Sequence, residues 1–242
     1  AWGPARTTLP GLRPWLEAAA SMAPFADRPV AVLVPSRSYG VFLKSRWMAE
    51  GGSFAGLHFW TPGDVLSFLL SKETAVERPA ADEDLELLLA LAAEPSEVPT
   101  AQSVAREPVG LLRALEALTS AGWTPSDLGL GGMQPVFERF AHLLSRMGLT
   151  TRAGAVQRLG MMEQPRPVIG KLLVVGFDAA HWSVWPILQA AIRHAAEASA
   201  CLFFAPRFQS ESIEQAWVGT WEQQWGAAQP LEDSAPGPYA VL

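Results

Sequence analysis

The sequence predicts an α/β fold: a parallel sheet with helices on both faces, interrupted by an all-helical insertion lobe. Three mostly apolar runs, at residues 30–34, 171–177 and 200–205, are typical of parallel strands that are buried on both faces. Helical patterns separate these runs, and residues 80–160 hold helical patterns without a convincing strand. Strand–helix–strand order at both ends of the chain indicates that the two ends share one sheet.

The first strand is expected between two helices. A helix is predicted over residues 12–23, where Pro14 is tolerated in the first turn. The strand at 30–34 is ended by Pro35, and a second helix runs from the polar turn that follows it to about residue 50.

A second, shorter strand is predicted at residues 57–60, followed by a helix at 65–71. Thr61 is in the position of a helix N-cap, Pro62 in the first helical position and Asp64 in the third. This spacing predicts a variant of the capping box, in which the Thr and Asp side chains bond to each other's backbone amides.

The middle of the chain is predicted to be a separate helical lobe at residues 79–164. Helices are expected at 82–93, 109–121, 133–147 and 151–159, and a loop at 94–108, which is rich in Pro, Ser and Glu.

The strand pattern returns in the last third of the chain. The expected order is a strand at 171–177, a helix at 185–198, a strand at 200–205, a helix at 210–225, a linker at 230–238 and the start of a further strand at 238–242. We therefore predict a discontinuous α/β domain made of residues 1–78 and 165–242.

Composition narrows the class of protein. Apolar residues make up 49% of the 242 residues and charged residues 17%, enough for a substantial core. The formal charge of −6 does not favour a free-standing nucleic-acid binder, although a local basic surface remains possible. The lone Cys201 lies in an apolar run, and no signal peptide or membrane span is visible. We expect a cytoplasmic protein with no membrane partner, and a fragment of a longer polypeptide.

Several segments resemble those of superfamily 1 helicases. Residues 32–37, followed by a helix, resemble the second conserved helicase segment, and residues 59–66 resemble the next. Residues 137–150 are similar to a helix of helicase–nuclease B subunits of the AddB/RexB type, and residues 172–178 resemble the degenerate Walker B strand of that family. The resemblance implies a RecA-like (P-loop-like) sheet in an inactivated helicase half. It also implies a motor helicase subunit as partner and a PD-(D/E)XK nuclease domain further along the same polypeptide.

The nucleotide site of such a fold is degenerate here. Gly3, Arg6 and Thr7 lie where a P-loop would be, but Arg6 replaces the lysine and Ala5 the second glycine. Asp178 is the lone carboxylate after the strand at 171–177, whereas hydrolysis needs acidic residues that hold Mg²⁺ and orient water. An ordinary loop at the N-terminus and a turn or N-cap role for Asp178 are the alternatives. We expect no ATP hydrolysis, no cofactor and no catalytic residue in this chain.

The candidate DNA-contacting residues follow the first two strands. Ser36, Arg37 and Ser38 form a polar turn, with Trp60 and Thr61 at the end of the next strand. Ligands of α/β sheets bind at the carboxyl ends of strands, hydroxyls and Arg contact phosphates, and an exposed Trp stacks on bases. The alternative is a solvated turn with a buried Trp. The four histidines and one cysteine show no metal spacing.

Three functions remain open from the sequence. The first is a non-catalytic scaffold in a DNA end-processing complex, in contact with a single- or double-stranded DNA end. The second is a small-molecule or phosphate-binding enzyme with a pocket near Pro35, Thr61 and Asp178. The third is a protein–protein adaptor that uses the helical lobe.

Overall fold

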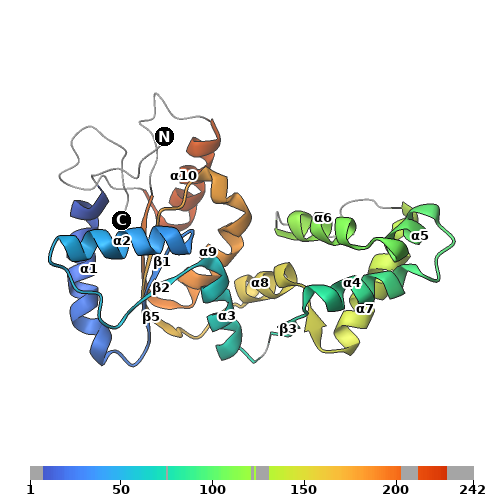
Figure 1. The fold of residues 1–242 in the computed structure, drawn as a ribbon, viewed down its shortest axis with the longest axis horizontal. Coiled ribbons are helices and arrows are strands. Elements are labelled where there is room, and N and C mark those ends of the chain that lie inside the picture. Colours follow the sequence, from blue (N-terminus) through green and yellow to red (C-terminus); the bar gives the residue numbers. More distant parts are fainter. Residues whose placement is uncertain (1–7, 75, 121–122, 124–130, 203–211, 228–242) are drawn as a thin grey trace. The chain divides into compact units, whose positions relative to one another are not determined.

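The α/β class predicted from the sequence is confirmed by a computed structural model of the chain (Figure 1). The structure describes residues 8–74, 76–120, 123, 131–202 and 212–227. The chain divides into two compact units: an α/β unit of Ala1–Leu69 with Gln164–Leu242, and a helical unit of Leu70–Glu163.

The α/β unit is built on a four-stranded parallel sheet in the order β2-β1-β5-β6. Its strands are β1 (Val30–Leu33), β2 (Leu57–Trp60), β5 (Ile169–Val175) and β6 (Ala195–Cys201). In the register, Val30 of β1 lies opposite Leu57 of β2 and Lys171 of β5. The early and late strands therefore share one sheet, as predicted.

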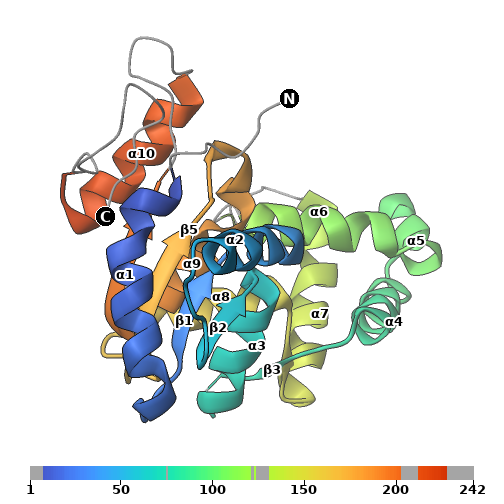
Figure 2. The same cartoon turned by 60° about the vertical axis from the view of Figure 1, so that its left-hand side comes forward.

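Helices cover the two faces of this sheet. They are α1 (Thr8–Met22), α2 (Arg37–Ala49), α3 (Pro62–Lys72), α9 (Trp185–Arg193) and α10 (Ser212–Trp225), with short 3₁₀ helices η1 (Ala23–Phe25) and η3 (Ala179–Val184). Figure 1 draws α1 and α2 on one side of the sheet and α9 on the other, and Figure 2 brings α1 forward. Right-handed crossovers explain this division, because β1–α2–β2 and β5–α9–β6 step across the sheet in opposite directions.

Alternate strand residues form the core under α1 and α2. Val32 and Leu173 are fully buried there against Leu12 and Leu16 of α1 and Leu43 of α2. Successive side chains of a strand point to opposite faces of the sheet, so the residues before and after Val32 and Leu173 face its other side. The continuously apolar strands predicted at 30–34 and 171–177 are explained by burial on both faces.

The fourth strand differs from its prediction. The sequence indicated a helix over 185–198 and a strand over 200–205, but the helix ends at Arg193 and the strand is Ala195–Cys201. Residues 203–205 lie outside the described residues. The prediction was wrong because residues 195–200 are mostly alanine and serine, and pairing with β5 overrides their local preference.

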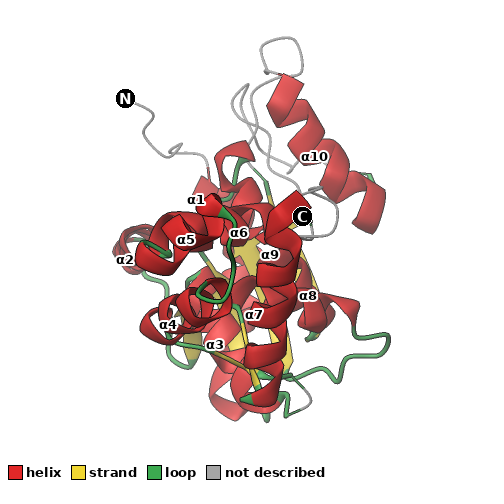
Figure 3. Ribbon diagram, turned by 90° about the vertical axis from the view of Figure 1, so that its right-hand side faces the viewer, coloured by secondary structure: helices red, strands yellow, loops and turns green. Residues whose placement is uncertain are grey.

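The helical unit contains two features that the sequence analysis missed. Its elements are α4 (Asp82–Ala93), α5 (Pro99–Arg106), α6 (Val109–Ser120), η2 (Gly131–Met133), α7 (Gln134–Arg146) and α8 (Arg152–Met161), with strands β3 (Arg78–Pro79) and β4 (Leu149–Thr150). Helix α5 occupies residues predicted to be a loop, with a proline at its start as helices tolerate. The strands β3 and β4 pair in parallel, so the lobe is not all helical (Figure 3). Two-residue strands carry no periodicity that a sequence pattern can detect.

The core of the helical unit lies between α4 and α7. Leu85 and Leu89 of α4 are buried with Val136, Phe140 and Leu144 of α7. The Arg139 guanidinium of α7 also donates to the carbonyl oxygen of Ala92 at 2.6 Å, which satisfies an acceptor in the last turn of α4. The helical spacing that predicted α7 from the sequence therefore reflects its buried face.

A cluster of tryptophans joins α10 to the start of α9. The rings of Trp182 and Trp185 contact Trp217, and Trp185 also contacts Trp221 and Trp225. Trp217, Trp221 and Trp225 are four residues apart, so one face of α10 presents all three. These five tryptophans therefore pack against one another.

Candidate functional site

The candidate site lies where the parallel strands end and the next helices begin. Strands β1 and β2 are paired to their last residues, and the amide of Val34 donates to the carbonyl oxygen of Trp60 at 2.8 Å. The turns after β1, β2 and β5 therefore meet at one edge of the sheet, where α/β folds bind their ligands.

The turn after β1 presents hydroxyl groups at the start of α2. Ser36 is the extended N-cap residue of α2, and its Oγ accepts a hydrogen bond from the amide of Tyr39 at 3.2 Å. The Ser36 hydroxyl proton stays available to donate. Ser36 and Ser38 are both exposed. Two hydroxyl donors thus face solvent at this edge.

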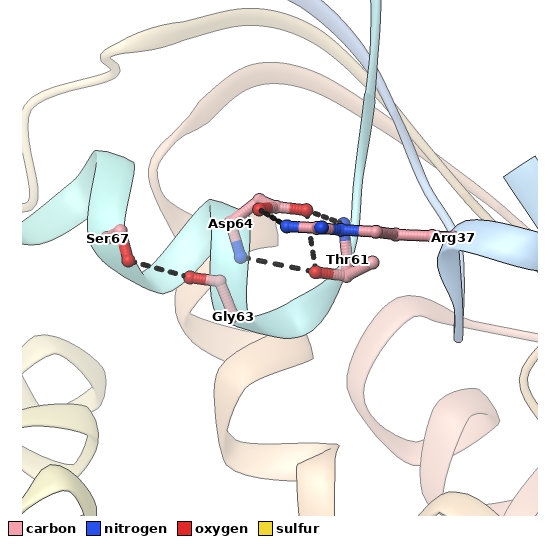
Figure 4. A network of polar contacts seen from close by, with 5 residues as sticks. All are labelled: Arg37, Thr61, Gly63, Asp64 and Ser67. Carbon is pink, nitrogen blue, oxygen red and sulfur yellow. Dashed lines mark hydrogen bonds and ion pairs between the residues drawn. The ribbon is translucent and has the colours of Figure 1, made fainter.

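The turn after β2 forms the predicted capping box (Figure 4). The Asp64 carboxylate accepts from the Thr61 amide at 2.9 Å and from the Thr61 hydroxyl at 2.6 Å, and the Asp64 amide points to Thr61 Oγ1 at 3.4 Å. These hydrogen bonds lower the pKa of Asp64. Both donors of Thr61 are therefore occupied by Asp64.

Arg37 reaches toward the same carboxylate from the start of α2. Its Nη2 lies 3.9 Å from Asp64 Oδ1, and 87% of the Arg37 side chain is exposed. A contact this long and this exposed stabilises the fold little. Arg37 is therefore a cation held loosely at the strand ends, able to turn toward an external anion.

Helix α2 carries two further cations, Lys44 and Arg46. The ammonium group of Lys44 lies over the ring of Phe59 at 4.7 Å, and Arg46 Nε lies 3.8 Å from a carboxylate oxygen of Glu50. Arg46 is held no more tightly than Arg37, but it lies in the last turn of α2, whereas Arg37 lies at the strand ends and is the more exposed of the two.

Trp60 lies at the end of β2 but is packed rather than freely exposed. Its ring centroid is 4.8 Å from that of Phe68 in α3 and 5.5 Å from that of His58. A base stacked on Trp60 would compete with these neighbours. Among the predicted residues, Ser36, Arg37 and Ser38 are better placed for contact with a polymer backbone than Trp60 is for stacking, whereas the donors of Thr61 are occupied by Asp64.

Asp178 caps the short helix η3 that follows β5. Its Oδ1 accepts from the amide of Ala180 at 3.0 Å and lies 2.7 Å from His181 Nδ1. An N-cap that is also paired with a histidine is engaged in the local fold. The described residues contain no group of three or more His, Cys, Asp or Glu arranged to hold a metal ion. Gly3, Arg6 and Thr7 lie outside the described residues.

Sequence reasoning missed the contact between Tyr39 and Gly176. Gly176 follows β5 with φ +85°, and a Cβ added there would lie 2.7 Å from the Tyr39 ring. The ring of Tyr39 therefore lies directly over the end of β5, where only glycine leaves room for it. A glycine directly after a buried strand, as at Gly176, is a signal for a special backbone conformation. The sequence did not indicate that Tyr39 of α2 would lie against it.

Burial of Tyr39 makes the free energy of unfolding depend on pH in the alkaline range. Desolvation raises the pKa of its phenol to about 12. Because the phenol stays protonated in the folded chain while it ionises in the unfolded chain near pH 10, this contribution is intact below pH 10 and lost as the pH rises toward 12. We expect the free energy of unfolding to fall by up to about 2 kcal/mol over this window. Urea titrations should show a smaller fall in Tyr39→Phe, and equal falls in the two proteins would contradict the assignment.

Two cavities are lined by residues other than those of the turns after β1, β2 and β5. One, of about 220 Å³, is in the helical unit and is lined by Leu112, Leu115, Phe137, Phe140 and Leu144 among others. The other, of about 280 Å³, lies beside β6 and the end of α10. Neither contains Pro35, Thr61 or Asp178, around which the small-molecule hypothesis placed its pocket.

Comparison with known proteins assigns the chain to no family. No protein-family model and no curated protein matches the sequence. Within the described residues, no helix is both long and apolar enough to cross a membrane. The function must therefore be argued from the site itself.

Proposed function

We propose that this chain is a non-catalytic, helicase-like domain of an AddB/RexB-type DNA end-processing complex. In this proposal the carboxyl edge of its sheet contacts the backbone of single-stranded DNA, and the domain acts as a scaffold. A motor helicase subunit and a nuclease domain further along the polypeptide would supply the chemistry.

The observation that carries the proposal is the loosely held Arg37 among hydroxyl groups at the strand ends. An exposed guanidinium beside Ser36 and Ser38 offers charge-assisted and neutral hydrogen bonds to a phosphate. Such backbone contacts need no base recognition, so they suit a protein that follows DNA of any sequence. The parallel sheet with helices on both faces is compatible with the helicase-like order of segments.

The state of Asp178 supports a role without nucleotide hydrolysis. A catalytic carboxylate must be free to hold Mg²⁺ or to orient water. Here the Asp178 carboxylate accepts from the Ala180 amide and contacts His181. Asp178 is also the one acidic residue among residues 176–179, directly after β5. The proposal therefore assigns Asp178 to capping η3.

Replacing Arg37 with alanine tests the DNA contact directly. We expect the affinity for an oligothymidine to fall about three- to tenfold at 0.1 M salt, and the slope of log K against log salt to become shallower by about 0.7, because one phosphate contact is lost. Fluorescence anisotropy titrations at several salt concentrations measure both quantities. Arg28→Ala is the matched control, because Arg28 is an exposed arginine just before β1, at the opposite edge of the sheet. Equal effects of the two substitutions would refute a site at the carboxyl edge.

Replacing Asp64 with asparagine should have the opposite effect on DNA. Asparagine keeps a side-chain oxygen for Thr61 but removes the negative charge 3.9 Å from Arg37. We expect the DNA affinity to rise about threefold, since an exposed pair of this kind is worth about 0.2–1 kcal/mol. Asp27→Asn, at an exposed position before β1, is the control. A loss of affinity in Asp64→Asn would show that the carboxylate aids DNA binding rather than opposing it.

A further inference from the structure

The cavity of the helical unit is lined by residues from three helices and one strand. Its volume is about 220 Å³, and α6, α7, α8 and β4 all contribute to its wall. Most of this wall is apolar, and its buried members are Leu112, Leu115, Phe137, Phe140 and Leu144. Small molecules bind in cavities of this kind, where an apolar wall carries a few polar groups that fix the orientation of the ligand.

The volume of the cavity suits a compact molecule with two fused rings. A dry apolar cavity of about 150 Å³ takes up benzene, which has a single ring. The cavity in the helical unit is larger, at about 220 Å³, so it has room for a second ring. The side chains of Phe137 and Phe140 in its wall offer aromatic partners to such a molecule.

One buried hydroxyl group in the wall has no hydrogen-bond partner among the described residues. Thr150 of β4 lines the cavity and is only 5% exposed. Its carbonyl oxygen accepts from the amide of Ala80 at 2.9 Å, and the hydroxyl of the neighbouring Thr151 accepts from the amide of Gly154 at 3.0 Å. The Thr150 hydroxyl makes no such bond within the described ranges. A buried hydroxyl without a partner is costly, and a polar group on a bound molecule would remove this cost.

The charged residues of the wall disfavour an anionic ligand. Glu116 of α6 lines the cavity and brings a carboxylate to it. Arg158 of α8 also lines the cavity, but its guanidinium group is paired with the carboxylate of Glu77. The positive charge of Arg158 is therefore already balanced, whereas the Glu116 carboxylate would repel a further anion. Hydroxyl and carboxylate oxygens both accept hydrogen bonds, so a neutral molecule with a donor group suits this wall.

We propose that this cavity binds a neutral aromatic molecule of two fused rings, whose N–H or O–H group donates a hydrogen bond to Thr150. Burial of the rings among leucine and phenylalanine side chains supplies the affinity, and the hydroxyl of Thr150 sets the orientation. Indole has this chemistry, because it combines two fused rings with one N–H group. It is therefore the probe for the site.

Calorimetric titration of the 242-residue chain with indole tests the site. We expect saturable binding of one indole per chain. Ala141 of α7 lines the cavity but is exposed, so Ala141→Trp should fill part of the cavity without unfolding the chain and should weaken binding about tenfold or more. His142→Trp is the matched control, because His142 is the next exposed residue of α7 and does not line the cavity. This variant should bind indole as the unchanged chain does.

The role of Thr150 is tested by removing either partner of the proposed hydrogen bond. Indene has the two fused rings of indole without the N–H group, so it should bind the unchanged chain about three- to tenfold more weakly. Thr150→Val removes the hydroxyl at nearly constant volume. We expect this variant to lose affinity for indole by the same factor while its affinity for indene does not fall. The comparison of the two ligands on the unchanged chain needs no substitution.

Four results would overturn the proposal. The absence of saturable indole binding, or equal binding in Ala141→Trp and His142→Trp, would show that the cavity is not the site. Indene that binds as tightly as indole would remove the role of Thr150. Tighter binding of indole-3-carboxylate than of indole would contradict the neutral class of ligand. The residues of the cavity all belong to the helical unit, whereas Arg37 belongs to the α/β unit, so the proposed DNA contact is tested separately.

Discussion

Replacing Trp217 with alanine is expected to lower the free energy of unfolding by about 3–5 kcal/mol. Only 1% of Trp217 is exposed, and its ring contacts those of Trp182, Trp185 and Trp221 at centroid separations of 5.1, 5.4 and 5.8 Å. Removing the indole leaves a cavity between α10 and η3 that these rigid rings cannot fill. The edge-to-face contacts of the ring are lost as well.

Two further substitutions in the tryptophan cluster, Trp225→Ala and Trp217→Phe, are the controls. Trp225 belongs to the same face of α10 but is 44% exposed, so Trp225→Ala should cost about 1–2 kcal/mol. The buried Trp217 Nε1 has no hydrogen-bond partner in the described part of the chain, so Trp217→Phe gives up no hydrogen bond there and should cost less than Trp217→Ala. Urea unfolding followed by far-ultraviolet circular dichroism measures all three. Equal costs for Trp217→Ala and Trp225→Ala would contradict the larger contribution that burial assigns to Trp217.

Gly176→Ala is the second substitution with a large expected effect, a loss of about 2–4 kcal/mol in the free energy of unfolding. A left-handed backbone accounts for about 1–2 kcal/mol of this cost. The remainder comes from the added Cβ, which would lie 2.7 Å from the Tyr39 ring and force that ring away from the end of β5.

A substitution at Gly51 measures the backbone cost without the cost of a Cβ contact. It also has a positive φ, of +81°, but a Cβ added there meets nothing within 4 Å. Gly51→Ala should therefore cost only the backbone part, about 1 kcal/mol. A double-mutant cycle with Tyr39→Ala should recover most of the difference between Gly176→Ala and Gly51→Ala. Without a coupling between positions 176 and 39, the close approach of Tyr39 to the strand end would not be energetically important.

The sequence predicted the centre of the sheet well because burial on both faces leaves a visible pattern. Residues 30–34 and 171–177 are almost continuously apolar, and β1 and β5 are the two central strands. The edge strand β6 consists mostly of alanine and serine and has no large apolar residue. The strand was therefore predicted at residues 200–205, where the sequence is apolar. Helix α5 was missed for a related reason, since Ala101 is its one fully buried residue and gives little periodicity.

The candidate site was predictable only where its contacts are local. The Thr61–Asp64 capping box spans three residues, and such spacing is readable from the sequence. The position of Tyr39 over Gly176 and the pairing of Arg37 with Asp64 depend on which strands become neighbours. Sheet order is a tertiary property, so the local sequence around Tyr39 carried no sign of its partner.

We propose that the chain contacts single-stranded DNA without using nucleotide. Thermal unfolding in the presence of an oligothymidine, and separately of ATP with Mg²⁺, tests this claim in one measurement. A ligand at 100 times its Kd stabilises the folded chain by about 2.7 kcal/mol. We expect a rise in Tm with the oligothymidine that shrinks in Arg37→Ala, and no change in Tm with ATP and Mg²⁺. A rise with ATP and Mg²⁺, or no response to the oligothymidine, would refute the proposal.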